Sequence, residues 1–153
     1  MPPSGPTATR LRTLHVIVGV MIAGVLVFTA VVSFLVTAGT LPLEPNPAFG
    51  YLIYAAVGYL AISLLAAPMI DGRVGRAAPG SDDDVVAQKW ITGAIVGMAI
   101  REGAALFALV ASLLVGSVPW ALAFGLISAA GMGMAWPRAH ELEERLNEAR
   151  RSG

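Results

Sequence analysis

Residues 90–115 read WITGAIVGMAIREGAALFALVASLLV. A helix of about 20 apolar residues crosses the roughly 30 Å hydrocarbon core of a bilayer, so this run is long enough to span a membrane. Arg101 and Glu102 interrupt it near the middle and are its only charged residues. The stretch therefore predicts a membrane-spanning helix that carries two adjacent charges at depth.

Three further apolar runs lie at 13–37, 49–70 and 118–136. Turn-forming residues separate the runs, and the last break is only "GSVP", which makes the last two spans antiparallel neighbours. Hydrophobic residues make up 56% of the 153 residues and charged residues 13%, whereas an ordinary soluble domain has about 45–50% and about 25%. We expect an all-α polytopic membrane protein in which residues 1–136 form a four-helix transmembrane bundle, arranged as two antiparallel hairpins.

The first run has an alternative interpretation, because Arg10 and Arg12 precede it as in a secretory signal peptide. The apolar region of such a peptide has about 7–15 residues. The run at 13–37 is longer, so a retained membrane helix is favoured.

Basic residues lie on one side of the predicted membrane. Cytoplasmic loops of membrane proteins carry the excess of Lys and Arg. Apart from Arg101, every basic residue precedes the first span, lies between the second and third, or follows the fourth: Arg10, Arg12, Arg73, Arg76, Lys89, Arg138, Arg145, Arg150 and Arg151. The pattern predicts a multi-pass membrane protein with both termini in the cytoplasm. Span ends also carry Trp90, Trp120 and Trp136, whose rings are expected at the membrane interface.

Residues 137–153 form a polar tail with helical spacing. Leu142 and Leu146 lie four residues apart, and Glu141 is placed to pair with Arg145 one turn further on. We expect a short cytoplasmic helix, which is either a solvated tail or a docking surface for a partner.

Small residues recur on the third and fourth spans. Helices in membranes associate through close packing of small residues, because lipid tails are as apolar as leucine. We expect these residues to meet across the short connection: Gly93, Gly97, Ala104, Ala108 and Ala111 on the third span, and Gly125, Ala129 and Gly133 on the fourth. The alternative is that small residues are simply common in membrane helices, since such a pattern is weak support for any particular pairing.

Arg101 and Glu102 are the candidate proton- or ion-binding residues. At 1.5 Å per residue, Glu102 lies about 18 Å beyond Trp90 and thus near the membrane midplane. A central charge is unfavourable by about 2.5–3.5 kcal/mol on insertion scales, and such residues commonly pair or mark ion and proton paths. Consecutive helical residues point about 100° apart, so one must curl toward the other or each must find its own partner. No other charge lies inside a predicted span.

The segment IVGMAIREGAALFALVASLLV, residues 95–115, resembles the carboxylate-bearing helix of the rotary ATP synthase proteolipid, subunit c. That resemblance rests on an acidic residue flanked by Gly and Ala and followed by an aromatic and aliphatic run, and it implies that Glu102 is a reversible proton or sodium site. It covers one helix, and the preceding span lacks the alternating glycines of the proteolipid. As a whole, with Glu-Gly-Ala-Ala-Leu-Phe in the third span and Trp-Pro-Arg ending the fourth, the chain resembles bacterial four-helix membrane proteins of no assigned activity that are sometimes labelled proteolipid-like.

Two functions from different classes fit these features. The first is a non-enzymatic structural or accessory subunit of a membrane complex, in which Arg101 and Glu102 neutralise each other or tie helices together. The second is a proton- or cation-handling subunit that uses Glu102. The expected partners are the lipid bilayer and either further copies of the chain or other membrane subunits.

Composition argues against several other classes. The chain has no cysteine, which excludes disulfides, thiolate catalysis and Cys-based zinc sites. A formal net charge of zero and scattered basic residues predict no nucleic-acid partner. His15 and His140 are expected at different depths, which disfavours haem ligation by the pair. We interpret Asp82, Asp83 and Asp84 as solvated charges at the positive end of a helix rather than as a cation site, and we expect no metal and no cofactor.

Overall fold

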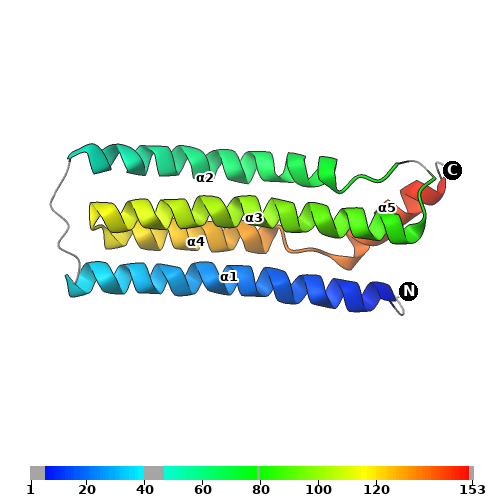
Figure 1. Ribbon diagram of the computed structural model, residues 1–153, viewed down its shortest axis with the longest axis horizontal. Helices are drawn as coiled ribbons and strands as arrows, with labels where there is room; N and C mark the ends of the chain where they lie inside the picture. The colour runs from blue at the N-terminus through cyan, green and yellow to red at the C-terminus, as the bar shows by residue number, and fades with distance from the viewer. Residues whose placement is uncertain (1–5, 40–46, 79, 152–153) are drawn as a thin grey trace.

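The computed structural model describes residues 6–39, 47–78 and 80–151, and every regular element in these ranges is an α-helix. The helices lie side by side as an elongated bundle, except for the last, which sits at one end (Figure 1). Their bounds are α1 Pro6–Ala38, α2 Pro47–Val74, α3 Asp83–Val115, α4 Val118–Met134 and α5 Ala139–Arg151.

Three of the helices have the length and composition of membrane spans. They contain the apolar segments Thr9–Ala38, Phe49–Val74 and Asp83–Val115. The fourth helix, α4, has 17 residues, whereas a span needs about 20. It passes the same test only together with α5, from which it is separated by a bend of 45°. The structure therefore has three spans by length and composition, or four if the bent pair is one.

The helix α3 lies at the centre of the bundle. It packs against α1, α2 and α4, and its beginning also contacts α5. By contrast, α1 and α2 hardly touch, although they follow each other in the chain. The expected arrangement as two antiparallel hairpins is therefore not confirmed, because the first two spans do not pack against each other. The reason is that α1 buries its apolar stripe in the groove between α3 and α4 instead.

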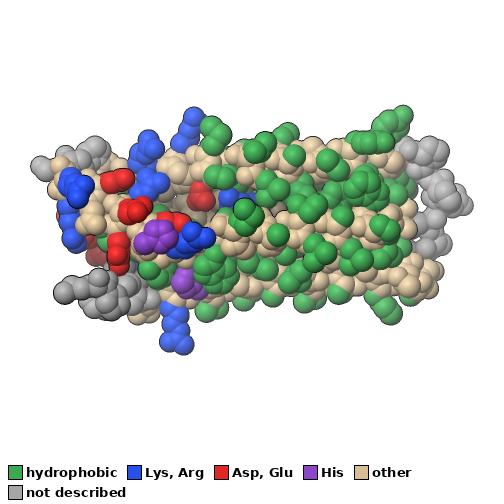
Figure 2. Space-filling model, turned by 180° about the vertical axis from the view of Figure 1, so that it is seen from behind, with side chains coloured by type: hydrophobic (Ala, Val, Ile, Leu, Met, Phe, Trp, Pro, Cys, Tyr) green, Lys and Arg blue, Asp and Glu red, His purple; other side chains and the backbone are tan. Residues whose placement is uncertain are grey.

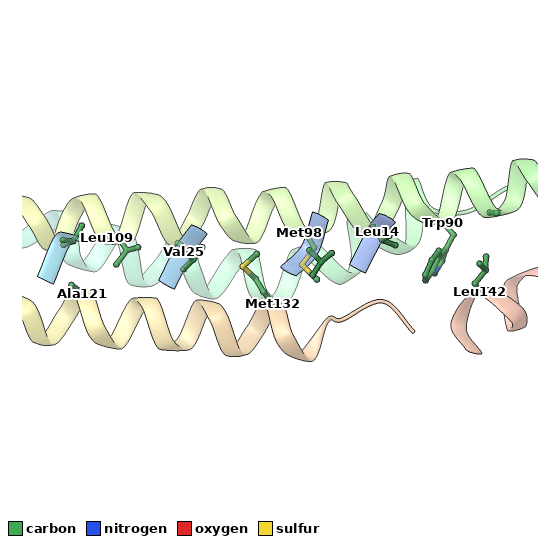
Figure 3. Packing of buried hydrophobic residues seen from close by; sticks show 12 residues of the cluster. Leu14, Val25, Trp90, Met98, Leu109, Ala121, Met132 and Leu142 are labelled. Atoms are coloured by element: carbon green, nitrogen blue, oxygen red, sulfur yellow. The ribbon is translucent and has the colours of Figure 1, made fainter. Parts of the chain in front are cut away.

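That stripe shows how the main core is built. Leu14, Val18, Val25 and Val32 are spaced by four or seven residues, so they lie on one side of α1, and each is almost completely buried. Val25 lies among side chains from α3 and α4 (Figure 3), in one cluster with Met98, Leu109, Ala121 and Met132.

A second core joins α2 to the opposite side of α3. Ile53, Ala56 and Leu60 of α2 form one cluster with Phe124 of α4 and with the small residues Ala104, Ala108 and Ala111 of α3. The small side chains of α3 let the two backbones approach closely, as is usual in membrane helix pairs.

The glycines of the small-residue stripe on α3 face α2, which differs from the expected contact with the small residues of α4, while Ala104, Ala108 and Ala111 share their cluster with Phe124 of α4 as well. A Cβ atom added at Gly93 would lie 2.6 Å from the backbone oxygen of Asp71 in α2 and 2.8 Å from the Cα of Gly75, which directly follows α2. At Gly97 the nearest atoms are those of the Asp71 carboxylate. A four-residue connection makes α3 and α4 neighbours, but it does not decide which of their faces meet.

The small residues of α4 do not form one interface either. A Cβ atom added at Gly125 would contact the side chain of Thr29 in α1. Ala129 is partly buried, and Gly133 is exposed with no atom within 4 Å of such a Cβ position. The contact of α4 with α3 instead uses larger side chains, among them Met132.

Charged side chains gather at one end of the bundle, while the rest of the visible face is largely hydrophobic (Figure 2). At this end α1 begins, α2 ends, α3 begins and α5 lies beside the beginning of α3 (Figure 1). We call it the charged end. The predicted tail helix is confirmed as α5, and it packs on the bundle through Leu142, which is 3% exposed and lies in one cluster with Trp90 of α3, while its other side is exposed. Trp90 is therefore covered by α5 rather than exposed to a membrane interface.

Candidate functional site

Arg101 and Glu102 are directed to different neighbours of α3. Arg101 is 4% exposed, and its Nη1 atom lies 3.1 Å from the position that a Cβ of Gly97 would take, on the side of α2. Glu102 is partly exposed, and its Oε1 atom lies 4.0 Å from the corresponding position at Gly24 of α1. The two residues therefore do not neutralise each other, and each meets its own surroundings.

The carboxylate that faces Arg101 belongs to Asp71 of α2. Its Oδ2 atom lies 2.8 Å from the Cβ position of Gly97, next to the guanidinium. Because Gly97 has no side chain, the carboxylate of one helix and the guanidinium of the other both reach the space above it. The positive charge of Arg101 and the negative charge of Asp71 attract each other.

Sequence reasoning missed Asp71, because the second span was expected to end at residue 70. The structure continues α2 to Val74, so Asp71 lies inside the helix. A signal was present: Ala56, Leu60, Ser63 and Ala67 recur every three or four residues and are all buried, and the same spacing continues to Asp71. Extending the helical period by one turn would have placed Asp71 on the face toward α3.

Arg101 and Asp71 are close without being in direct contact. In the described residues, ion pairs with a nitrogen–oxygen distance of at most 4.0 Å join Arg10 to Asp84 and Arg150 to Asp83, and none involves Arg101. The Nη1 atom of Arg101 is buried and has no hydrogen-bond partner there. The guanidinium and the carboxylate thus lie near each other without a direct ion pair.

Both side chains line a cavity of about 720 Å³ between α2, α3, α4 and α5. Its charged lining consists of Asp71 and Arg101 within the bundle and of Glu141 and Arg145 on α5. Both residues of α5 also act electrostatically on Asp71. The remaining lining is mostly apolar or backbone: Leu64, Pro68, Gly72, Gly75, Trp90, Ile127, Ala130, Gly131, Met134 and Ala135. Glu102 does not line this cavity.

Two aspartates at the start of α3, Asp83 and Asp84, link this helix to α5 and α1. Asp84 accepts a hydrogen bond of 2.9 Å from Arg10 of α1, and Asp83 accepts hydrogen bonds from Arg150 of α5. Among the described residues no group of three or more His, Asp or Glu side chains is arranged to hold a metal ion.

His15 has a structural environment. Its Nε2 atom lies 2.8 Å from the backbone oxygen of Pro137, and its ring stacks on Trp136 with the ring centres 5.2 Å apart. Since a carbonyl oxygen only accepts, Nε2 carries the proton and donates this bond. The contact holds the beginning of α1 against the connection between α4 and α5.

Comparison of the chain with models of protein families, with curated proteins and with solved structures found no match.

Proposed function

We propose that this chain is a non-enzymatic structural or accessory subunit of a membrane complex, embedded as a four-span protein in the bacterial inner membrane with both termini in the cytoplasm. The distribution of basic residues supports the orientation, since all of them except Arg101 flank the ends of helices that meet at the charged end. The helix α4 supplies the fourth span, because its 17 residues extend about 25 Å and the chain continues to Trp136 before it turns.

The observation that carries the proposal is the position of Glu102. This carboxylate lies near the middle of α3, is partly exposed beside Gly24 of α1, and has no ion pair in the described part of the chain. A charged or polar group at this depth is unfavourable against lipid and is normally turned toward protein or water. A second membrane subunit, or a second copy of this chain, that covers the surface formed by α1 and α3 would remove the group from lipid.

The partner can be tested by purification from native membranes in a mild detergent. We expect Glu102→Leu to release a membrane protein that the wild type retains, or to convert an oligomer into a monomer. The variant itself should stay folded, because Glu102 is partly exposed and forms no ion pair in the described part of the chain. Glu148→Leu is the matched control, since that glutamate is exposed on α5. An unchanged set of co-purifying proteins and an unchanged mass for Glu102→Leu would contradict the proposal.

A proton- or cation-handling role is the second candidate, and one observation favours it. Arg101 turns toward Asp71 instead of Glu102, so the carboxylate of Glu102 is not neutralised by its neighbour. If Glu102 is such a site, a carbodiimide should modify it selectively, because the reagent attacks protonated carboxyls in apolar surroundings, and sodium ions or high pH should protect it. If Glu102→Leu loses the partner and the carbodiimide does not modify Glu102 in the wild type, the accessory role stands and the proton- or cation-handling role is rejected.

A further inference from the structure

The cavity between α2, α3, α4 and α5 is lined by a buried donor that nothing in the described part of the chain satisfies. Arg101 is 96% buried, as its exposed fraction of 4% implies, it lines the cavity, and its Nη1 atom lacks a hydrogen-bond partner. Buried polar groups are almost always paired with protein, water or a ligand. This guanidinium is therefore poised to bind an anionic oxygen that enters the cavity.

The charges of the cavity wall select the kind of molecule. Two cations, Arg101 and Arg145, and two carboxylates, Asp71 and Glu141, line the same space. A purely anionic ligand would meet two carboxylates, and a purely cationic ligand would meet two guanidinium groups. A zwitterionic group, with an ammonium for the carboxylates and an anionic oxygen for the guanidinium groups, is complementary to both pairs.

The other wall of the cavity is apolar and reaches the outer face of the bundle. Leu64 and Pro68 contribute to it from α2, and Ile127 and Met134 from α4. Ile127 is 50% exposed and Met134 is 81% exposed, so the cavity is continuous with the surface that hydrocarbon would cover. An apolar chain can lie along this wall while a polar head reaches the charged residues.

We propose that this cavity is the binding site of a zwitterionic amphiphile, a molecule whose head carries an ammonium and an anionic oxygen group and whose tail is apolar. Arg101 and Arg145 bind the anionic oxygen, Asp71 and Glu141 bind the ammonium, and the wall formed by α2 and α4 holds the tail. The volume of about 720 Å³ falls within the range of small-molecule sites, roughly 300–1,000 Å³. The site does not include Glu102, and it does not depend on a partner that covers Glu102.

Thermal unfolding of the full chain, purified in a non-ionic detergent, tests the site with three probes. Dihexanoyl phosphatidylethanolamine has the zwitterionic head and apolar chains, dihexanoyl phosphatidylglycerol has an anionic head, and phosphoethanolamine is the head alone. A ligand that binds the folded state raises the unfolding midpoint with its concentration. We expect a rise with the phosphatidylethanolamine and a much smaller one with either of the other probes. Equal rises with both lipids, or an equal rise with phosphoethanolamine, would overturn the proposal.

Substitutions in the cavity lining test whether these residues cause the rise in the unfolding midpoint. Arg101→Met and Arg145→Met should each raise the half-maximal concentration of the phosphatidylethanolamine about tenfold, as expected for the loss of one strong charged contact. Ala130→Leu should raise the same concentration, because the larger side chain occupies part of the cavity. Arg138→Met is the control, because Arg138 is exposed and does not line the cavity. Arg145 lies on α5, outside the bundle core, so its variant decides the matter if Arg101→Met does not fold. An unchanged response of both Arg145→Met and Ala130→Leu would overturn the proposal.

Discussion

At the scale of single residues, the direction of the Arg101 side chain explains how a cation is accommodated within an apolar helix. Side chains of a helix tilt toward its N-terminus, and α3 begins at the charged end. The guanidinium therefore lies about one turn back from its own Cα, beside Gly97 and Asp71, and its apolar stem fills the space along the way. The charge is thus drawn toward a carboxylate and a cavity instead of toward lipid.

Removal of Asp71 tests this pairing. We expect Asp71→Asn to destabilise the folded protein by about 1–3 kcal/mol, the usual effect of leaving a buried charged group without its partner. Asp84→Asn is the matched control: it removes the ion pair with Arg10, whose two side chains are 43% and 82% exposed, and such surface pairs stabilise a protein little. Thermal unfolding in detergent measures both variants.

The double variant Asp71→Leu with Arg101→Met separates pairing from packing. Apolar replacement of both members of a buried pair is often tolerated, whereas removal of one member is not. We expect the double variant to be more stable than Asp71→Asn alone. If Asp71→Asn unfolds at the same temperature as the wild type, the carboxylate does not stabilise Arg101.

At the scale of helices, glycine decides how closely α2 and α3 approach. Gly93 and Gly75 lie opposite each other, and a Cβ atom on Gly93 would come within 2.8 Å of two backbone atoms of Gly75. Backbone atoms cannot move aside as a flexible side chain can. The contact therefore sets the distance between the two helices near the charged end, and with it the position of Asp71 relative to Arg101.

Alanine substitutions distinguish this glycine from others. We expect Gly93→Ala to lower stability by roughly 1–3 kcal/mol through overpacking. Gly133→Ala places its methyl group in open space, so it should be neutral or slightly stabilising, because alanine favours the helix more than glycine does. The comparison of unfolding midpoints in one detergent measures both, and equal midpoints would show that α2 and α3 do not meet at Gly93.

At the scale of the whole molecule, the charged side chains of the described residues gather at one end of the bundle, and the described residues of the opposite end carry none. The connection between α3 and α4, at Gly116 and Ser117, lies at the end opposite the charged end. The connection between α2 and α3 lies at the charged end, together with α5. From the positive-inside rule we expect the charged end to face the cytoplasm.

Cysteine labelling tests this orientation, and the chain has no cysteine of its own to interfere. We expect a cysteine at Ser117 to react with an impermeant thiol reagent added to intact cells, and one at the exposed Ala78 to react only after the membrane is opened. Reaction at Ala78 in intact cells would reverse the orientation.

The sequence by itself determined the helices and the gathering of charge at one end. Hydropathy and helix length act within each segment, so the apolar runs could be recognised one at a time, and the flanking Lys and Arg residues needed no knowledge of packing. Arg101 stood out for the same reason, since a charge in an apolar run is visible locally.

Only the tertiary structure decided which faces meet. It placed the small residues of α3 against α2, set α1 against α3 and α4 in place of α2, and docked α5 on Trp90. It also brought Asp71 to Arg101, residues that lie on different helices. Many faces of an apolar helix bury similar area, so the choice among them depends on how all helices fit together, and neither hydropathy nor spacing along one segment contains that information.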